Sequence, residues 1–202
     1  MPQDTDEALV VRYQRGDVAA FEALVDRHRP GVYRFLARFV RDRARAEDLT
    51  QECWLRFIGA VPRWSARAPF RIWLYAVARN LAADEARRMT HRRHESIDDT
   101  GASRPFAELP APGRTPEEAA LDLLLQPVLE QAIAALPAEQ REVFLLREYE
   151  GVAFAEIAAI TGSPIPTVKS RMRYALEALR RTLSELGVTA TDEQPRTEGA
   201  KP

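Results

Sequence analysis

One segment near the C-terminal end constrains the fold most, because it reads as two helices separated by a glycine. Residues 154–161 form a short apolar stretch, Gly162 allows a tight turn, and a second amphipathic segment continues to Arg180. Ser163 is a suitable N-cap for the second helix, and the prolines beside it fit a first helical turn, where a missing N–H costs little. This is the pattern of a helix-turn-helix, a motif that places its second helix in the major groove of DNA.

The two faces of this second helix differ in chemistry. Apolar residues recur every three or four positions and predict a buried stripe made of Ile165, Val168, Met172, Ala175, Leu176, Leu179 and Leu183. The other positions offer polar and charged groups that can reach base edges or phosphates, and the candidates are Thr167, Lys169, Ser170, Arg171, Arg173 and Tyr174. A core helix with a solvated basic face would give the same pattern, but the preceding helix and the glycine favour DNA binding.

The rest of the chain predicts an all-α fold. Sustained period-two alternation and Asn-Gly or Asp-Gly turns are absent from the sequence, whereas apolar residues at helical spacing are widespread. Thr5 or Asp6, Asp17 and Asp42 are candidate N-caps, and Pro69 opens a long helix. We therefore expect two small helical domains joined by a flexible linker, with boundaries at 1–94 for the first domain, 95–114 for an acidic linker, 115–186 for the second domain and 187–202 for a disordered tail.

Composition limits the cellular setting of the chain. The 202 residues are 46% hydrophobic and 29% charged, as in ordinary soluble globular proteins. No apolar run approaches the roughly 20 residues of a membrane span, and the polar, acidic N-terminus is not a secretory signal. A single cysteine, Cys53, excludes an internal disulfide and fits a reducing compartment. These features predict a cytoplasmic protein that does not insert into a membrane.

Charge is sorted along the chain, although the formal net charge is only −1. Residues 63–94 contain eight arginines against two acidic residues, whereas residues 95–150 contain twelve acidic residues against four arginines. Such segregation suggests one surface for a polyanion and another that avoids it. Solvated helix faces of differing sign are the alternative explanation.

Catalytic and metal-binding chemistry has little support in the sequence. There is no glycine-rich phosphate loop and no nucleophile–base–acid arrangement. His91 and His94 are spaced i, i+3, but no third ligand is near them and they lie among arginines. The chain is therefore not expected to be an enzyme, or to need a metal or another cofactor.

Two segments of the first domain narrow the answer. Residues 46–57 predict an amphipathic helix with an apolar side of Leu49, Cys53 and Phe57, with Trp54 and Leu55 at its margins. The polar side of this helix offers Asp48, Gln51, Glu52 and Arg56. Residues 70–84 follow as an aromatic and basic helix, and residues 167–171 read Thr-Val-Lys-Ser-Arg.

Together these three segments resemble sigma factors of the sigma-70 class, specifically the small two-domain extracytoplasmic-function (ECF) type. The resemblance covers about residues 6–94 and 117–183, in the family's order and with its intervening linker. It implies a subunit without a catalytic centre that directs core RNA polymerase to promoters and helps to open the DNA. The implied partners are core polymerase and promoter DNA, both duplex and single-stranded. Family members are often also held by an anti-sigma factor, although no feature of this sequence encodes that contact.

The resemblance also assigns roles to residues. The polar side formed by Asp48, Gln51, Glu52 and Arg56 matches the face that docks on the coiled-coil of the largest polymerase subunit, although on its own it could be a solvated surface. The part that captures an unpaired base of the −10 element and neutralises phosphates matches Arg63, Trp64, Arg67, Phe70, Arg71, Arg79, Asn80, Arg87 and Arg88. Trp73 and Tyr75 are further aromatics of this part, and we expect Trp73 to lie in the core.

The second helix of the helix-turn-helix matches the −35 reader, with departures from the common family pattern at Pro166 and Tyr174 that make its base preference unpredictable. The acidic linker, with Asp98, Asp99 and Glu108, resembles linkers that thread polymerase channels, and an inert tether is the alternative. The rival function is a freestanding helix-turn-helix regulator that binds duplex operator DNA without polymerase.

Overall fold

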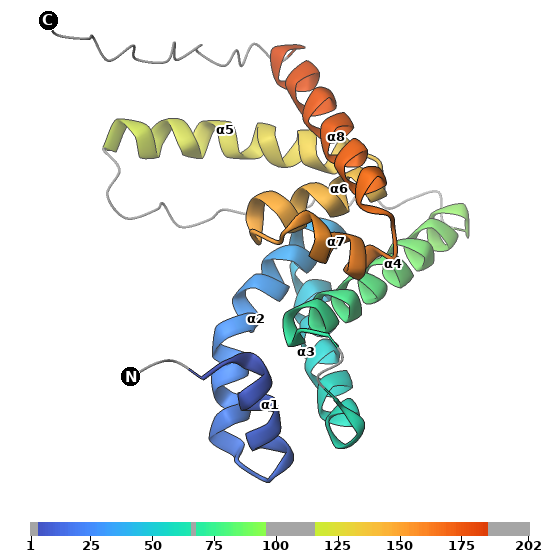
Figure 1. Ribbon diagram of the computed structural model, residues 1–202. Coiled ribbons are helices and arrows are strands. Elements are labelled where there is room, and N and C mark those ends of the chain that lie inside the picture. Colours follow the sequence, from blue (N-terminus) through green and yellow to red (C-terminus); the bar gives the residue numbers. More distant parts are fainter. Residues whose placement is uncertain (1–3, 66–67, 96–115, 186–202) are drawn as a thin grey trace, which may run out of the picture.

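The computed structural model describes residues 4–65, 68–95 and 116–185, and every regular element in those ranges is helical. The N-terminal domain contains α1 (Asp6–Gln14), α2 (Val18–Val40), α3 (Arg43–Ala60), the 3₁₀ helix η1 (Val61–Arg63) and α4 (Phe70–Glu95). The C-terminal domain contains α5 (Pro116–Ala135), α6 (Ala138–Phe144), the π-helical turn η2 (Leu145–Tyr149), α7 (Phe154–Thr161) and α8 (Ile165–Glu185). Figure 1 shows the two domains as the lower and upper parts of the molecule. The predicted all-α fold of two helical domains is confirmed, while the acidic linker and the tail lie outside the described residues.

Polar side chains begin the first three α-helices as the sequence predicts. Thr5, Asp17 and Asp42 each accept a hydrogen bond from the backbone N–H three residues later, at 3.0–3.3 Å. Each such cap satisfies a donor that the helix itself leaves unpaired, and is typically worth about 0.5–2 kcal/mol. The starts of α1, α2 and α3 are therefore set locally by the sequence.

Aromatic side chains fill the core of the N-terminal domain. Phe35, Phe57 and Phe70 are fully buried, and the ring centroids of Phe57 and Phe70 lie 4.9 Å apart in an edge-to-face arrangement. Phe57 shares its side of α3 with Leu49 and Cys53, both of which are also buried. Because this side of α3 faces the core, the polar side of the same helix faces outward.

The C-terminal domain contains the predicted helix-turn-helix. Between α7 and α8, Gly162 adopts φ 66° and ψ 22°, a left-handed conformation that glycine tolerates best, and its N–H bonds to the Ala158 carbonyl. Four side chains of α8 then pack into the domain core, and these are Val168, Met172, Ala175 and Leu179. The turn thus orients α8 so that its opposite face is left uncovered.

Two expectations for the start of α8 are wrong. Ile165 is 42% exposed rather than buried, because it is the first helical residue and the buried stripe begins only at Val168. The Ser163 hydroxyl does not cap the helix and instead accepts a hydrogen bond from Arg171 Nη1 at 2.9 Å. An N-cap side chain accepts a hydrogen bond from the backbone N–H two or three residues later. The residue three positions after Ser163 is Pro166, which has no N–H to donate.

The two domains contact each other directly, mainly between α4 and α7 and between α2 and η2. Within the described ranges, ion pairs cross this contact between arginines of the N-terminal domain and glutamates of the C-terminal domain. They are Arg34–Glu150 at 3.2 Å, Arg38–Glu130 at 3.1 Å and Arg79–Glu142 at 2.6 Å. All three glutamates come from the acidic segment 95–150, so part of the charge segregation serves a contact within the chain.

Candidate nucleic-acid and polymerase interface

The outer face of α8 offers three accessible groups among the residues that the sequence singles out. Lys169, Arg173 and Tyr174 are exposed, and the Arg173 guanidinium lies 4.8 Å from the centre of the Tyr174 ring. Thr167 and Ser170 are half-buried, and the Ser170 hydroxyl donates to the Thr167 carbonyl at 2.9 Å. The accessible chemistry of this face is therefore a cation next to a phenol, with a second cation at Lys169.

Arg171 has a structural task in this domain. Its guanidinium donates to the Ser163 hydroxyl at 2.9 Å and to Glu139 Oε2 on α6 at 2.6 Å, and its side chain is only 20% exposed. These bonds connect α6, the turn and α8. Arg171 thus helps to hold the helix-turn-helix together, whatever else it contacts.

Sequence reasoning missed the apolar start of α8 as a surface. Pro164, Ile165 and Pro166 are all exposed, directly beside Thr167. The signal was present in the two prolines, which shift the start of the helix and leave Ile165 outside the buried stripe. In helix-turn-helix proteins the N-terminal residues of the second helix are the ones that approach base edges.

The polar side of α3 is exposed as predicted. Asp48, Gln51 and Arg56 are exposed and Glu52 is half-buried, with an Arg56–Glu52 ion pair at 2.7 Å along the helix. These four residues follow the spacing i, i+3, i+4 and i+8, which brings them onto one helix face. The face combines donors and acceptors that can fix the register of another helix against it.

One apolar residue lies within this polar face and was not identified from the sequence. Leu55 is 66% exposed, three residues after Glu52 and four after Gln51. By helical spacing Leu55 was expected at the margin of the buried side, but Phe57 and Cys53 fill that side instead. The exposed Leu55 side chain adds apolar area to a helix face whose other side chains are polar.

Arg45 connects α3 to α4 beneath this face. Its guanidinium bonds to Glu85 Oε2 on α4 at 2.8 Å and lies 3.6 Å from Asp48 Oδ2. Glu85 is buried and lies 3.6 Å from the exposed Arg88. A continuous row of alternating charges therefore runs from the polar side of α3 to the outer half of α4.

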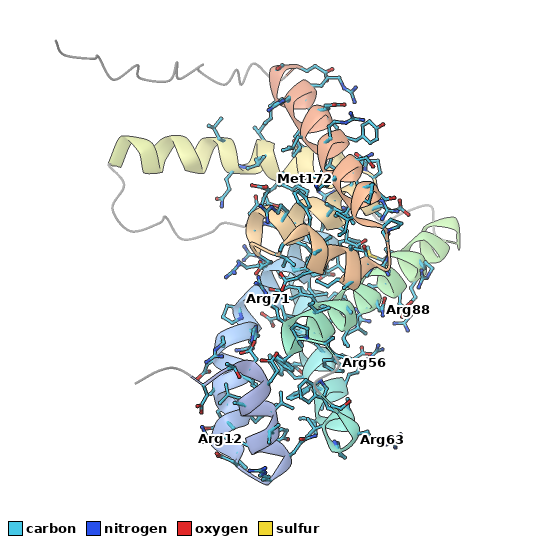
Figure 2. All side chains as sticks on the ribbon, in the orientation of Figure 1. Arg12, Arg56, Arg63, Arg71, Arg88 and Met172 are labelled. Atoms are coloured by element: carbon cyan, nitrogen blue, oxygen red, sulfur yellow. The ribbon has the colours of Figure 1, made fainter. Side chains whose placement is uncertain are left out.

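The residues expected to bind the −10 element differ in their exposure. Arg63, Asn80, Arg87 and Arg88 are exposed, and Figure 2 shows Arg63 at the end of α3 and Arg88 on the far half of α4. Trp64 is half-buried against the core, and the Gln14 side chain fixes its loop by donating to the Trp64 carbonyl at 3.0 Å. Arg67 lies outside the described residues.

Five further residues of this part are buried or partly buried. Phe70 is fully buried against Phe57, so its ring cannot stack on a base in this structure, and Tyr75 is 2% exposed. Trp73 is partly buried and packs against the core, close to its expected position. Arg71 and Arg79 bond across the contact between the domains, where Arg71 donates to the Glu150 carbonyl and Arg79 donates to Glu142 Oε1 at 2.6 Å.

Other chemistry adds nothing to these surfaces. No cluster of three metal-ligating side chains occurs among the described residues, and the side chains of His91 and His94 lie outside them. Burial raises the pKa of the Cys53 thiol to about 12, so this thiol is inert at neutral pH. Over the part of the chain that the structure covers, no helix combines the length and apolar character needed to span a bilayer.

The comparisons with known proteins agree with this geometry. The family model described as sigma-70 region 2 matches residues 24–93, which cover most of α2 and extend into α4. The model described as sigma-70, region 4 matches residues 127–179, from α5 into α8. Each match lies within one of the two domains of the structure. Residues of the two matched segments form the contact between the domains.

Relatives similar over most of the chain carry the same description. The ECF RNA polymerase sigma factor SigL of Mycobacterium tuberculosis is 40% identical over 182 residues, covering 86% of this chain and 94% of that protein. SigC of the same organism, also an ECF RNA polymerase sigma factor, is 37% identical over 180 residues, covering 85% of this chain and 88% of that protein. The sigma factor RpoE of Bartonella quintana, solved with the anti-sigma factor NepR, has a similar fold, with a TM-score of 0.67 at 22% identity over 81% of this chain and 96% of that chain. The chain therefore belongs to the sigma-70 family, as a sigma factor of the ECF group.

Proposed function

We propose that this ECF sigma factor binds core RNA polymerase through α3 and directs it to promoters whose −10 and −35 elements are recognised by separate domains. The observation that carries this proposal is that one chain combines two exposed helix faces. The face on α3 matches the polymerase-docking face of the family, and the face on α8 is basic. The chain acts as a specificity subunit in the cytoplasm, and the catalysis belongs to the polymerase.

The polymerase-binding surface consists of Asp48, Gln51, Glu52 and Arg56 around Leu55. The polar groups of such a face set the register and orientation of the docked helices, whereas the leucine contributes apolar area that is removed from water on docking. The exposure of Leu55, Asp48, Gln51 and Arg56 on one side of α3 supports this assignment.

The −10 surface consists of the loop after η1 and the outer half of α4. Trp64 is the aromatic best placed for stacking, because it lies at the domain surface while Phe70 and Tyr75 are buried. Base stacking is worth roughly 1–3 kcal/mol per base, and extracting a base from the duplex costs a few kcal/mol. Phosphate contacts offset that cost, and the arginines assigned to them are Arg63, Arg67, Arg71, Arg79, Arg87 and Arg88, with Asn80 beside a base edge.

The −35 surface is the outer face of α8. Arg173 and Tyr174 are the residues most accessible for base edges, Lys169 is suited to phosphate, and Thr167, Ser170 and Arg171 lie at the margin of the contact. We add Ile165 to this surface, because an exposed aliphatic side chain at the start of a recognition helix suits the C5-methyl group of thymine.

The decisive experiment combines a double variant with core polymerase. Asp48→Ala together with Gln51→Ala is expected to abolish co-purification with core polymerase while the helical circular dichroism stays unchanged. Glu22→Ala together with Asp26→Ala is the matched control, since these residues form an exposed i, i+4 pair of polar side chains on α2. Co-purification of the first variant at the wild-type level contradicts the docking assignment.

Run-off transcription tests the function as a whole. Core polymerase with this chain is expected to start transcripts at defined promoters on genomic fragments, and core polymerase alone is not. A freestanding regulator would instead footprint tightly on duplex sites without polymerase, usually as a dimer on a palindrome. Failure to join core polymerase together with such a footprint would replace the proposal by that rival.

An anti-sigma factor is a further partner that we propose. The RpoE neighbour is described as a complex with the anti-sigma factor NepR, and the chain has the same fold. Pull-down of cell extract with the tagged chain, followed by disruption of any gene whose product is recovered, tests this. An increase of transcription from the chain's promoters after disruption is the expected result.

A further inference from the structure

A polar cleft of about 650 Å³ lies where α1, α2 and α4 meet the η2 turn of the C-terminal domain. The N-terminal domain lines it with Arg27, Arg34, Arg71 and the Tyr75 hydroxyl, and Glu150 enters from the other domain. Arg27 is occupied within the N-terminal domain, because it pairs with Asp6 at 2.5 Å. Arg34, Arg71 and Tyr75 instead direct their donors at Glu150.

Both carboxylate oxygens and the backbone carbonyl of Glu150 are contacted by groups of the N-terminal domain. Its Oε2 accepts from Tyr75 OH at 2.9 Å and from Arg34 Nη2 at 3.2 Å, and its Oε1 lies 3.4 Å from Arg34 Nε. Its backbone carbonyl accepts from the Arg71 guanidinium. The side chain is only 4% exposed, so the carboxylate is enclosed by groups of the N-terminal domain. Hydrogen bonds of this charge-assisted kind select a carboxylate by both its charge and its two-oxygen geometry.

The cleft is also shaped for this carboxylate. A Cβ atom added to Gly31 of α2 would lie 2.6 Å from Glu150 Oε2 and 2.6 Å from the Tyr75 hydroxyl. Any side chain at this position would therefore push the carboxylate or the phenol away. Only the glycine lets the backbone of α2 approach the docked group this closely.

A second glutamate reinforces the contact. The Glu142 side chain is 4% exposed and accepts a hydrogen bond from Arg79 Nε at 2.6 Å. Arg79 lies about two turns further along α4 than Arg71. Burial raises the pKa values of both Glu142 and Glu150, although their arginine partners oppose the shift. Buried ion pairs of this kind add little net stability, because desolvation cancels much of the attraction. A contact built from them is therefore compatible with separation of the domains.

We propose that this cleft is a carboxylate-binding site whose ligand is Glu150 of the chain's own C-terminal domain, and that its occupation holds the free protein closed and withholds Arg71 and Arg79 from DNA. The part that concerns DNA rests on the proposed function, since it takes both arginines as phosphate contacts of the −10 surface. In the closed form their guanidiniums already have acidic or carbonyl partners, so a phosphate must compete with Glu142 and Glu150. Separation of the domains on polymerase frees both groups.

Two substitutions in the full-length chain test the site by different routes. Glu150→Gln keeps the size of the side chain and removes its charge, and Gly31→Ala keeps every charge and blocks the seat of the carboxylate. The matched controls are Glu148→Gln, an exposed glutamate two residues away, and Gly59→Ala, a helical glycine with open space around its Cα. Small-angle X-ray scattering measures the radius of gyration of each protein, and circular dichroism confirms that each is folded.

We expect both test variants to be more expanded than the wild type and both controls to match it. Single-stranded DNA from the −10 region of a promoter found by run-off transcription, labelled for fluorescence anisotropy, should bind the two test variants on the order of threefold to tenfold more tightly, because a closed population reduces the apparent affinity. An unchanged radius of gyration in both variants overturns the proposal, and expansion without tighter DNA binding overturns its DNA part. If no variant and no polymerase complex binds the strand, the proposed function fails, while the scattering result still decides whether the cleft closes the chain.

Discussion

Replacement of Leu55 by alanine separates the folding of the chain from its docking. Full burial of a leucine side chain is worth about 1.5–3 kcal/mol, and Leu55 is 66% exposed in the free protein. If polymerase covers the exposed two-thirds, Leu55→Ala removes roughly 1–2 kcal/mol of binding free energy. That corresponds to a Kd for core polymerase about 5- to 30-fold higher. The free energy of unfolding should change by less than about 0.5 kcal/mol, since the side chain makes little contact and alanine favours helix.

The assay pairs two measurements on the same protein. Titration of core polymerase into fluorescently labelled chain gives the Kd, and urea unfolding followed by circular dichroism gives the free energy of unfolding. Val18→Ala is the control, because Val18 is 60% exposed on α2, away from the polar face of α3. The reasoning is refuted if Leu55→Ala binds core polymerase as the wild type does, or if its loss of binding is matched by a comparable loss of stability.

Three other predictions concern α8 and the buried thiol. Arg173→Ala should weaken binding to −35 duplex DNA without changing the unfolding free energy. Arg171→Ala should weaken this binding and also destabilise the C-terminal domain by about 0.5–1.5 kcal/mol. Gel-shift and unfolding measurements on the same proteins distinguish the two effects. Replacing thymine by uracil, one position at a time, in the −35 element should weaken DNA binding of the wild type at one position. The same replacement should leave DNA binding of Ile165→Ala unchanged. If no replacement changes binding of the wild type, the methyl contact is excluded. Cys53, with its pKa raised to about 12 by burial, should react with a thiol reagent at pH 8 only as fast as the protein unfolds, so rapid labelling in native buffer would contradict its burial.

The elements that are fixed by nearby residues were predictable from the sequence. The caps at Thr5, Asp17 and Asp42 each need only an N–H three residues away, so their positions follow from the local pattern. The buried side of α3 and the left-handed Gly162 were predictable for the same reason, because helical spacing and backbone freedom are local properties.

The exposed apolar residues were harder to place. Leu55 and Ile165 fit an apolar pattern with helical spacing, yet both are exposed. The buried stripe of α3 is filled by Cys53 and Phe57 and does not extend to Leu55, and the buried stripe of α8 begins only at Val168. Phe70 differs in the opposite direction: the family resemblance assigned it to base capture, whereas in this structure its ring is buried in the domain core against Phe57.

Contacts between the domains could not be predicted at all. Arg79 and Glu142 are separated by 63 positions, and Arg34 and Glu150 by 116, so no periodicity relates them. The segregation of acidic and basic segments was visible in the sequence. Its meaning was not, because a run of carboxylates pairs equally well with arginines of the same chain, with solvent or with another molecule.

The row of charges through Arg45 has a genetic consequence. Asp48, Arg45, Glu85 and Arg88 alternate in sign from the outer side of α3 to the outer half of α4. Loss of the carboxylate at position 48 leaves the Arg45 guanidinium to Glu85 alone, which loosens the hold of Glu85 on Arg88. Selections for altered promoter usage should therefore also yield changes on α3, the helix that we propose to dock on polymerase, and such alleles would be misread as defects in recruitment unless both properties were measured.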